Sequence, residues 1–160
     1  MRMTIAAIGR MKAGPETDLV ERYLQRLRKA GMPLGLDFAG VIELPESRAS
    51  SADERKRDEA ARLIAALPEK AALVLLDERG RSMGSAAFAE RLAAIRDEGL
   101  RDVAFVIGGP DGLSPELRAG SHLSIGLGEM TWPHQIVRIL LAEQLYRATT
   151  ILSGHPYHRA

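Results

Sequence analysis

The stretch Val103-Ala-Phe-Val-Ile-Gly-Gly-Pro-Asp-Gly-Leu-Ser114 joins an apolar run directly to a glycine-rich turn. The run at 103–107 is typical of a buried strand, and the turn at 108–112 holds three glycines and one proline. Glycine lacks a Cβ and tolerates positive φ, so a ligand can approach the backbone of such a turn closely. Open α/β sheets bind their ligands where strands end in loops of this kind. The stretch therefore predicts an α/β fold with a small-molecule site at the turn.

The segments around this stretch alternate between the patterns of strands and helices. We expect strands at 3–8, 34–44, 73–76, 103–107 and 123–127, and helices at 16–30, 54–66, 85–97 and 133–152. This alternation predicts an α/β fold with a mostly parallel sheet and helices on both faces. Because no internal repeat or linker interrupts the pattern, residues 1–160 are expected to form a single domain.

Local signals mark the ends of some of these elements. Asp53 is expected to cap the helix at 54–66, and Thr131 the helix at 133–152, whose first turn contains Pro133. The small polar stretch 47–51 is predicted to be a mobile loop.

Composition places the chain among soluble globular proteins, with 46% apolar and 27% charged residues. The absence of cysteine excludes disulfides and thiolate metal sites. No apolar run has the length of a membrane span, and the N-terminus turns polar too early for a signal peptide, so a cytoplasmic location without membrane contact is expected. The net charge of +1 gives no support to nucleic-acid binding, although a basic patch can still be assembled in space.

The helix expected at 133–152 is apolar on more than one face. Its apolar residues are Ile136, Val137, Ile139, Leu140, Leu141, Ala142, Leu145, Tyr146 and Ile151. A helix that only covers a sheet normally buries a single stripe. We therefore expect the second face to pack on another subunit in a homodimer. The alternative is a helix buried deep within a monomer.

The glycine turn lacks the signatures of a phosphate cradle. It does not match GxGxxG, and the chain has no P-loop lysine motif. Pro110 also removes a backbone donor that a phosphate would need. The turn therefore favours a ligand that is recognised by carbonyls and a few N–H groups, although a purely structural turn would look similar.

Two further segments carry residue types that suit chemistry. The loop Gly126-Leu-Gly-Glu-Met-Thr-Trp-Pro-His134 again joins a strand to a helix, although Trp132 and His134 could simply fill the core or cap the helix. The tail Ser153-Gly-His-Pro-Tyr-His-Arg-Ala160 concentrates histidine, tyrosine and arginine, which exchange protons, stack on bases and form hydrogen bonds. With no carboxylate or cysteine nearby in sequence, the tail is not predicted to bind a metal. The alternative is a disordered chain end.

These motifs resemble those of the ribosomal RNA large-subunit methyltransferase H family, a minimal group within the SPOUT methyltransferases. The resemblance covers the whole chain. It rests on four segments: 106–114, Met130-Thr-Trp-Pro-His-Gln135, Arg138-Ile-Leu-Leu-Ala-Glu-Gln-Leu-Tyr-Arg-Ala148 and His155-Pro-Tyr-His-Arg159. It implies a homodimer with a trefoil knot in the C-terminal half, and S-adenosylmethionine bound in that knot. The implied cofactor contacts are Leu76, Gly108, Leu127, Gly128, Glu129, Met130, Thr131 and Trp132.

The resemblance implies methylation of N3 of a pseudouridine in large-subunit ribosomal RNA on the assembled ribosome. For this reaction we place the catalytic residues in the tail as a hypothesis: His155 or His158 would assist proton loss or orient the base, Tyr157 would stack or form a hydrogen bond, and Arg159 would contact RNA. Arg138 and Arg147 are either RNA contacts or partners of carboxylates within the fold. The tail could close over the cofactor of a partner subunit.

Two other functions remain open at this point. One is a non-enzymatic ribosome-binding or assembly factor that retains the fold, which S-adenosylmethionine binding would distinguish. The other, an α/β enzyme with a different nucleotide, is disfavoured by the missing phosphate-loop motifs.

Overall fold

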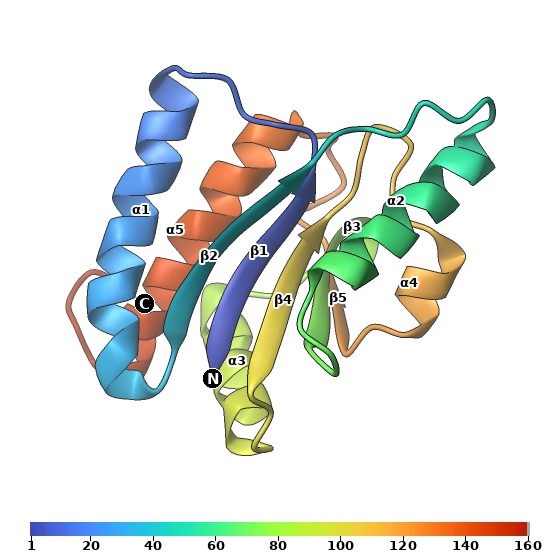
Figure 1. Ribbon diagram of the computed structural model, residues 1–160. Coiled ribbons are helices and arrows are strands. Elements are labelled where there is room, and N and C mark those ends of the chain that lie inside the picture. Colours follow the sequence, from blue (N-terminus) through green and yellow to red (C-terminus); the bar gives the residue numbers. More distant parts are fainter. Residues whose placement is uncertain (160) are drawn as a thin grey trace.

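The computed structural model describes residues 1–159 and contains one five-stranded sheet. In their order across the sheet, the strands are β2 (Asp37–Leu44), β1 (Arg2–Ile8), β4 (Asp102–Ile107), β3 (Ala72–Arg81) and β5 (Leu123–Ile125). Every neighbouring pair is parallel. The carboxyl ends of the strands therefore lie along one edge of the sheet (Figure 1).

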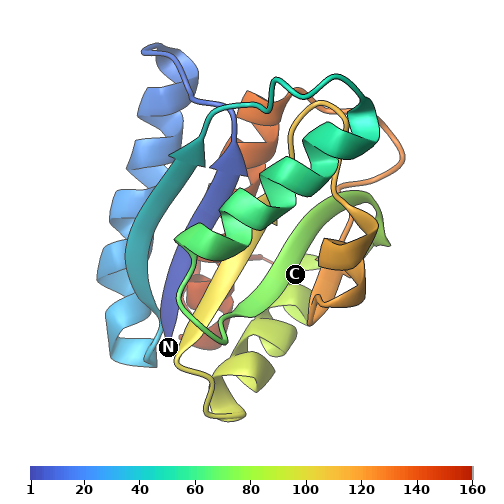
Figure 2. The ribbon, with the colours of Figure 1, turned by 45° about the vertical axis from the view of Figure 1, so that its right-hand side comes forward.

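Helices cover both faces of the sheet, as expected (Figure 2). They are α1 (Pro15–Gly31), α2 (Ala52–Ala66), α3 (Ser85–Asp97), α4 (Pro115–Ala119) and α5 (His134–Leu152), together with one 3-10 turn, η1 (Met32–Leu34). On one face α5 packs against both α1 and α3. The other face carries α2 and α4.

The strands divide their side chains between two apolar cores. Along β1, Met3, Ile5 and Ala7 belong to the core beneath α1, α3 and α5, whereas Ala6 and Ile8 belong to the core beneath α2 and α4. This is the two-residue alternation of a strand buried on both faces. β4 lies between β1 and β3 and is buried along its whole length, which explains its unbroken apolar sequence.

The expected strands and long helices are confirmed, although β2 begins at Asp37 rather than at 34, β3 extends to Arg81 rather than ending at 76, and both expected caps differ. Ser51, not Asp53, caps α2: its hydroxyl accepts the Glu54 N–H at 3.2 Å, and the Glu54 carboxylate accepts the Ser51 N–H at 3.1 Å. Thr131 does not cap α5, whose N-cap position is Pro133 and has no side-chain cap. The short helix α4 has no counterpart among the expected elements, because five residues are too few to show a helical period.

The loop between β2 and α2 is held by side chains of that helix. The carboxylate of Glu59 accepts the Ser47 N–H at 2.9 Å, and Arg62 donates to the Pro45 carbonyl at 2.8 Å. Arg55 donates to the Ala49 carbonyl at 3.2 Å. These contacts argue against the mobility expected for residues 47–51.

Beyond its pairing with β4, β3 makes a close backbone contact with the end of β5. β3 pairs with β4 only as far as Leu76, and its later part returns to β5 through the pair Arg81 and Ile125. A Cβ on Gly80 would lie 2.4 Å from the carbonyl carbon of Ile125, and one on Gly126 would lie 2.8 Å from the Gly80 carbonyl oxygen. Only glycine allows this approach. β5 ends here, at Ile125, rather than at 127.

Arg138 ties α5 to the ends of β1 and β2. Its guanidinium donates to the Glu43 carboxylate and to the Gly9 carbonyl, and the same carboxylate accepts the Met11 N–H at 3.0 Å. The Arg138 side chain is 4% exposed and that of Glu43 is 30% exposed. Of the two roles considered for Arg138, the structure therefore supports pairing within the fold.

We expect Glu43→Ala to destabilise the protein more than Arg138→Met. Loss of Glu43 leaves a buried guanidinium without its carboxylate, which costs about 3–5 kcal/mol. Loss of Arg138 leaves a carboxylate that water still reaches, which costs about 1–3 kcal/mol. Urea denaturation of both variants measures the difference, and the reverse order would contradict this account of the pair.

Candidate cofactor and active site

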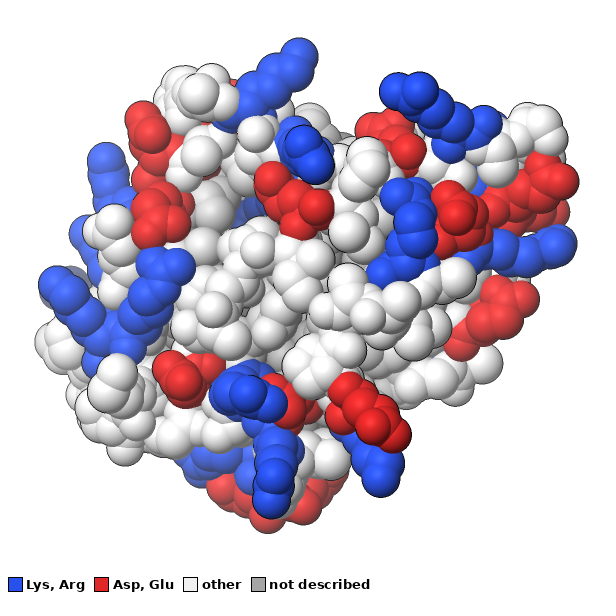
Figure 3. Space-filling view, viewed as in Figure 1, with Lys and Arg blue, Asp and Glu red and all other residues white. Residues whose placement is uncertain are grey.

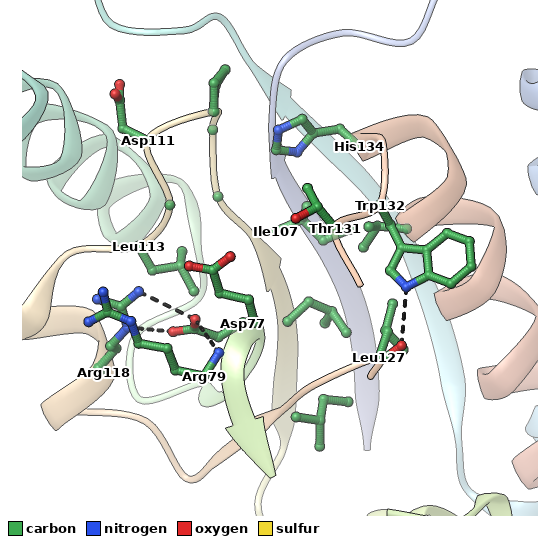
Figure 4. Close-up of a pocket in the computed structure, with 18 of the residues that line it drawn as sticks. Asp77, Arg79, Ile107, Asp111, Leu113, Arg118, Leu127, Thr131, Trp132 and His134 are labelled. Atoms are coloured by element: carbon green, nitrogen blue, oxygen red, sulfur yellow. Dashed lines mark hydrogen bonds and ion pairs between the residues drawn. The ribbon is translucent and has the colours of Figure 1, made fainter. Parts of the chain in front are cut away.

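A cavity of about 350 Å³ opens at the carboxyl ends of β3, β4 and β5. Three segments line it: residues 77–79 in the second half of β3, residues 108–113 after β4, and the loop after β5 from Leu127. His134 and Val137, from the first turn of α5, complete the wall. Figure 4 shows these segments facing one another across the cavity. The turn at 108–112 therefore lies at a strand end that borders a cavity, as its sequence predicts.

The cavity brings together nearly all the residues implied as cofactor contacts. Its lining includes Leu76, Gly108, Leu127, Gly128, Met130, Thr131 and Trp132. Glu129 lies in the same loop but is not among the lining residues. Residues more than 50 positions apart in the sequence thus share one small volume.

The glycine turn has little free space behind its backbone. A Cβ on Gly108 would lie 2.9 Å from Cδ2 of Leu113 and 3.1 Å from the Gly112 carbonyl oxygen. Gly112 has a φ of 84°, and its N–H donates to the Gly109 carbonyl at 2.9 Å. The turn is therefore a tight backbone loop that presents peptide groups, not side chains, at Gly108.

The loop after β5 places large apolar side chains at the rim of the cavity. Met130 and Trp132 are both exposed, so the core-filling alternative for Trp132 does not hold. The indole N–H of Trp132 donates to the Leu127 carbonyl at 3.1 Å, as drawn in Figure 4. Gly128, with a φ of 99°, allows the bend between these two residues.

A second cavity of about 450 Å³ lies beside the first, towards α3 and α5. The two cavities share a wall made of Leu76, Ile125, Leu127, Gly128 and Trp132. The second cavity is lined mainly by apolar residues, among them Phe88 and Leu141. The shared wall contains four of the residues implied as cofactor contacts, Leu76, Leu127, Gly128 and Trp132.

An ion pair that sequence reasoning missed forms the polar side of the first cavity. The Asp77 side chain is 3% exposed and accepts hydrogen bonds from the Arg118 guanidinium and, at 3.1 Å, from the Arg79 N–H. Burial alone would raise the pKa of Asp77, but the hydrogen bonds from Arg118 and the Arg79 N–H hold it below its usual value. The only signal in the sequence is an aspartate directly after the apolar run 73–76.

Asp77→Asn should remove a pH-dependent part of the stability. Because the folded-state pKa of Asp77 lies below the value of about 3.9 in an unfolded chain, its stabilisation is complete above that value and is lost as the pH falls through the folded pKa. The free energies of unfolding of wild type and variant should therefore converge below about pH 4. Chemical denaturation over a pH series measures this, and a gap that is constant with pH would contradict it.

The tail follows the end of α5 and folds back along that helix as far as Glu143, without lining the cavity. The Tyr157 hydroxyl donates to the Glu143 carboxylate at 3.0 Å, and its ring packs between Tyr146, at 4.8 Å between centroids, and the Arg147 guanidinium, at 4.9 Å. Burial raises the pKa of the Tyr157 phenol, and the hydrogen bond to Glu143 adds to that rise. Tyr157 is therefore a neutral donor that anchors the tail.

The histidines of the tail are held differently. Nδ1 of His155 accepts the Tyr157 N–H at 3.2 Å, which leaves Nε2 as the other hydrogen-bonding atom of the ring. Nδ1 of His158 lies 3.3 Å from the Arg147 guanidinium. Arg147 also pairs with Glu143, one helical turn away, so it pairs within the fold in this chain. Arg159 is exposed.

None of the tail residues His155, Tyr157, His158 and Arg159 lines the cavity of its own chain. His134 begins α5 at the cavity, whereas the tail follows the end of that helix and folds back along it as far as Glu143. One chain therefore brings the three lining segments together but does not add the tail to them. Among residues 1–159, no group of three His, Asp or Glu side chains is arranged to hold a metal ion. Over the same residues, no helix has both the length and the hydropathy of a membrane span.

A family model described as a predicted SPOUT methyltransferase matches residues 1–158. The chain belongs to the SPOUT methyltransferase family. Two relatives are each named ribosomal RNA large subunit methyltransferase H. The one from Brucella anthropi is 61% identical and the one from Rhizobium meliloti is 59% identical, and both alignments cover 100% of each chain. The family and the enzyme class expected from the sequence are thereby confirmed.

Two solved structures with lower identity also resemble this SPOUT methyltransferase. A probable methylase family protein from Haemophilus influenzae aligns with a TM-score of 0.48 and 11% identity, over 99% of this chain and 70% of the other. The SpoU methyltransferase AviRb from Streptomyces viridochromogenes, solved in complex with AdoMet, aligns with a TM-score of 0.40 and 13% identity, over 92% of this chain and 59% of the other.

Proposed function

We propose that this protein transfers a methyl group from S-adenosylmethionine to N3 of a pseudouridine in large-subunit ribosomal RNA. The observation that carries the proposal is the convergence of Leu76, Gly108 and the loop 127–132 on one cavity. Relatives of 55–61% identity that match the whole chain carry the name ribosomal RNA large subunit methyltransferase H. The site of action would be the cytoplasm, and the chain would thread through a trefoil knot around the cavity.

The residues of the cavity fit such a cofactor. Leu76, Leu127 and Trp132 offer an apolar surface for a flat adenine, and Gly108 offers bare backbone where a Cβ would fill the space. No phosphate cradle is needed, since the cofactor carries no phosphate. The polar side around Asp77 and Arg118 suits charged groups.

The main contribution of the protein would be alignment. When bound, S-adenosylmethionine supplies a methyl group on a cationic sulfur, which is already a good electrophile. The target nitrogen gains the methyl group and loses its proton. In this proposal Nε2 of His155 or the ring of His158 holds or receives that proton, Tyr157 positions the tail through Glu143, and Arg159 contacts RNA.

A homodimer would supply the missing half of the site. In the single chain, Ile136, Ile139 and Leu140 on α5 are only partly buried, so an apolar surface remains for a second copy. The tail of one chain packs on α5 beside Glu143 and lines no part of the cavity of the same chain. We therefore propose that the tail of each protomer closes over the cavity of its partner.

The assembled ribosome would be the substrate. The net charge is only +1, and in the view of Figure 3 basic side chains are interspersed with acidic ones. Such a surface offers little of the non-specific attraction to phosphate on which binding of isolated RNA depends. Recognition would then rest on the shape of the ribosome. Equal rates on whole ribosomes and on isolated RNA would contradict this part of the proposal.

The activity itself is tested by mass spectrometry of ribosomal RNA from cells that lack the protein. One large-subunit fragment containing pseudouridine should lose the mass of a methyl group, and wild-type protein should restore it. An unchanged fragment pattern would contradict the assigned reaction. If, in addition, calorimetry showed no S-adenosylmethionine binding at millimolar concentration, a non-enzymatic ribosome-binding factor would be the better interpretation.

Gly108→Ala is expected to weaken S-adenosylmethionine binding by about tenfold or more, because the added methyl group must displace Leu113 or the backbone of Gly112. Isothermal titration calorimetry measures the dissociation constant. The matched control is Gly120→Ala at the end of α4, where a Cβ would lie at an ordinary 3.5 Å from the nearest atom. Equal binding by the two variants would contradict the assignment of the turn.

A mixed dimer tests whether the site is composite. Gly108→Val should block the cavity, and His155→Ala should disable the tail. The homodimer of either variant should therefore be nearly inactive. In a mixed dimer, one site combines the intact cavity of one protomer with the intact tail of the other. Random mixing of co-expressed chains should therefore restore about a quarter of wild-type activity. If both halves of a site came from one chain, mixing would restore nothing.

A further inference from the structure

The glycine turn at 108–112 is supported from behind by α2. Arg55 and Glu59 lie four residues apart on this helix, so their side chains share one face. Both reach the turn, and both also hold the loop between β2 and α2. Neither residue lines the cavity, and neither belongs to the motifs that carry the family resemblance.

Arg55 makes a two-bond contact with the turn. Its Nε donates to Oδ2 of Asp111 at 2.7 Å, and a terminal nitrogen donates to Oδ1 at 3.1 Å. The other terminal nitrogen donates to the Ala49 carbonyl at 3.2 Å. The hydrogen bond from Arg55 also lowers the pKa of Asp111, so this carboxylate is ionised at neutral pH.

Glu59 fills the space between α2 and the glycine turn at 108–112. Its side chain is buried, and one carboxylate oxygen accepts the Ser47 N–H. The other oxygen would lie 2.8 Å from a Cβ on Gly109. The turn therefore rests directly on the helix, and any movement of α2 would move it.

We propose that Arg55 is a positioning residue for the cofactor: through Asp111 it holds the 108–112 turn in the conformation that presents the Gly108 backbone to the cavity. This inference rests on the function proposed above. The turn contains three glycines and is flexible by composition. A fork of two parallel hydrogen bonds restrains orientation as well as distance, which a single charge contact does not.

The ion pair between Arg55 and Asp111 should contribute more to the affinity for S-adenosylmethionine than to the stability of the fold. The side chains of Arg55 and Asp111 are 30% and 26% exposed, and ion pairs with this access to water contribute little to stability. A turn that is ordered before the cofactor arrives avoids the entropy cost of being ordered on binding. Loss of the pair should therefore appear as weaker binding by a protein that still folds.

The experiment compares Arg55→Ala, Arg55→Lys and Asp111→Asn with wild type in three measurements: the S-adenosylmethionine dissociation constant by calorimetry, KM and kcat on ribosomes, and the melting temperature. Arg55→Ala and Asp111→Asn should raise the dissociation constant and the cofactor KM about fivefold to tenfold, with kcat at saturation nearly unchanged. Arg55→Lys keeps the charge but loses the fork, so it should fall between wild type and Arg55→Ala. Melting temperatures should fall by only a few degrees.

Arg62→Ala is the matched control. Arg62 lies on the same helix, pairs with Asp58 at 3.2 Å and donates to the Pro45 carbonyl, but it does not contact the turn. The dissociation constant of S-adenosylmethionine for the Arg62→Ala variant should equal that for wild type. Because Arg55 also contacts Ala49, the double variant Arg55→Ala with Asp111→Asn is needed, and it should bind S-adenosylmethionine as weakly as either single variant.

Two outcomes would overturn the inference. Wild-type affinity in Asp111→Asn would show that the pair does not position the turn. Effects that multiply in the double variant would show that Arg55 acts independently of Asp111. Failure of the proposed function looks different, because wild-type protein itself would then bind no S-adenosylmethionine.

Discussion

The backbone contact between Gly80 and residues 125–126 is the constraint on which the site depends. At this contact the end of β3 crosses β5, and β5 ends at Ile125. The chain then continues into the loop 127–132, directly opposite the 108–112 turn. The wall shared by the two cavities includes Ile125 from this contact, and it presents backbone at Gly128 and apolar surface at Leu76 and Trp132.

The parts of the site that sequence reasoning located are those with a local signal. A glycine turn after an apolar run marks a strand end, so the sequence alone places Gly108 at the ligand-facing edge of the sheet. The capping residue of α2 also had a signal, since Ser51 with Glu54 forms a capping box that Asp53 cannot make. The five-residue α4 had none.

Contacts between distant residues could not be predicted in the same way. Asp77 and Arg118 are 41 positions apart, and Arg55 and Asp111 are 56 apart. Neither pair follows a periodicity, because each depends on which strands become neighbours in the sheet. The tail shows the same limit: its residue types predicted chemistry, but in its own chain it packs against Glu143 on α5 and does not line the cavity.

The strand order has a consequence for how the site comes into existence during folding. β1 pairs with β4, which begins 100 residues later in the chain, and β4 in turn carries the turn at Gly108. Such long-range parallel pairing is slow to form, because a large loop must close before any contact offsets the entropy cost of closing it. While the chain is being synthesised, its first half contains β2 but not β4, so β1 can pair only with β2. The cavity beside Gly108 therefore appears late, after most of the protein has been synthesised.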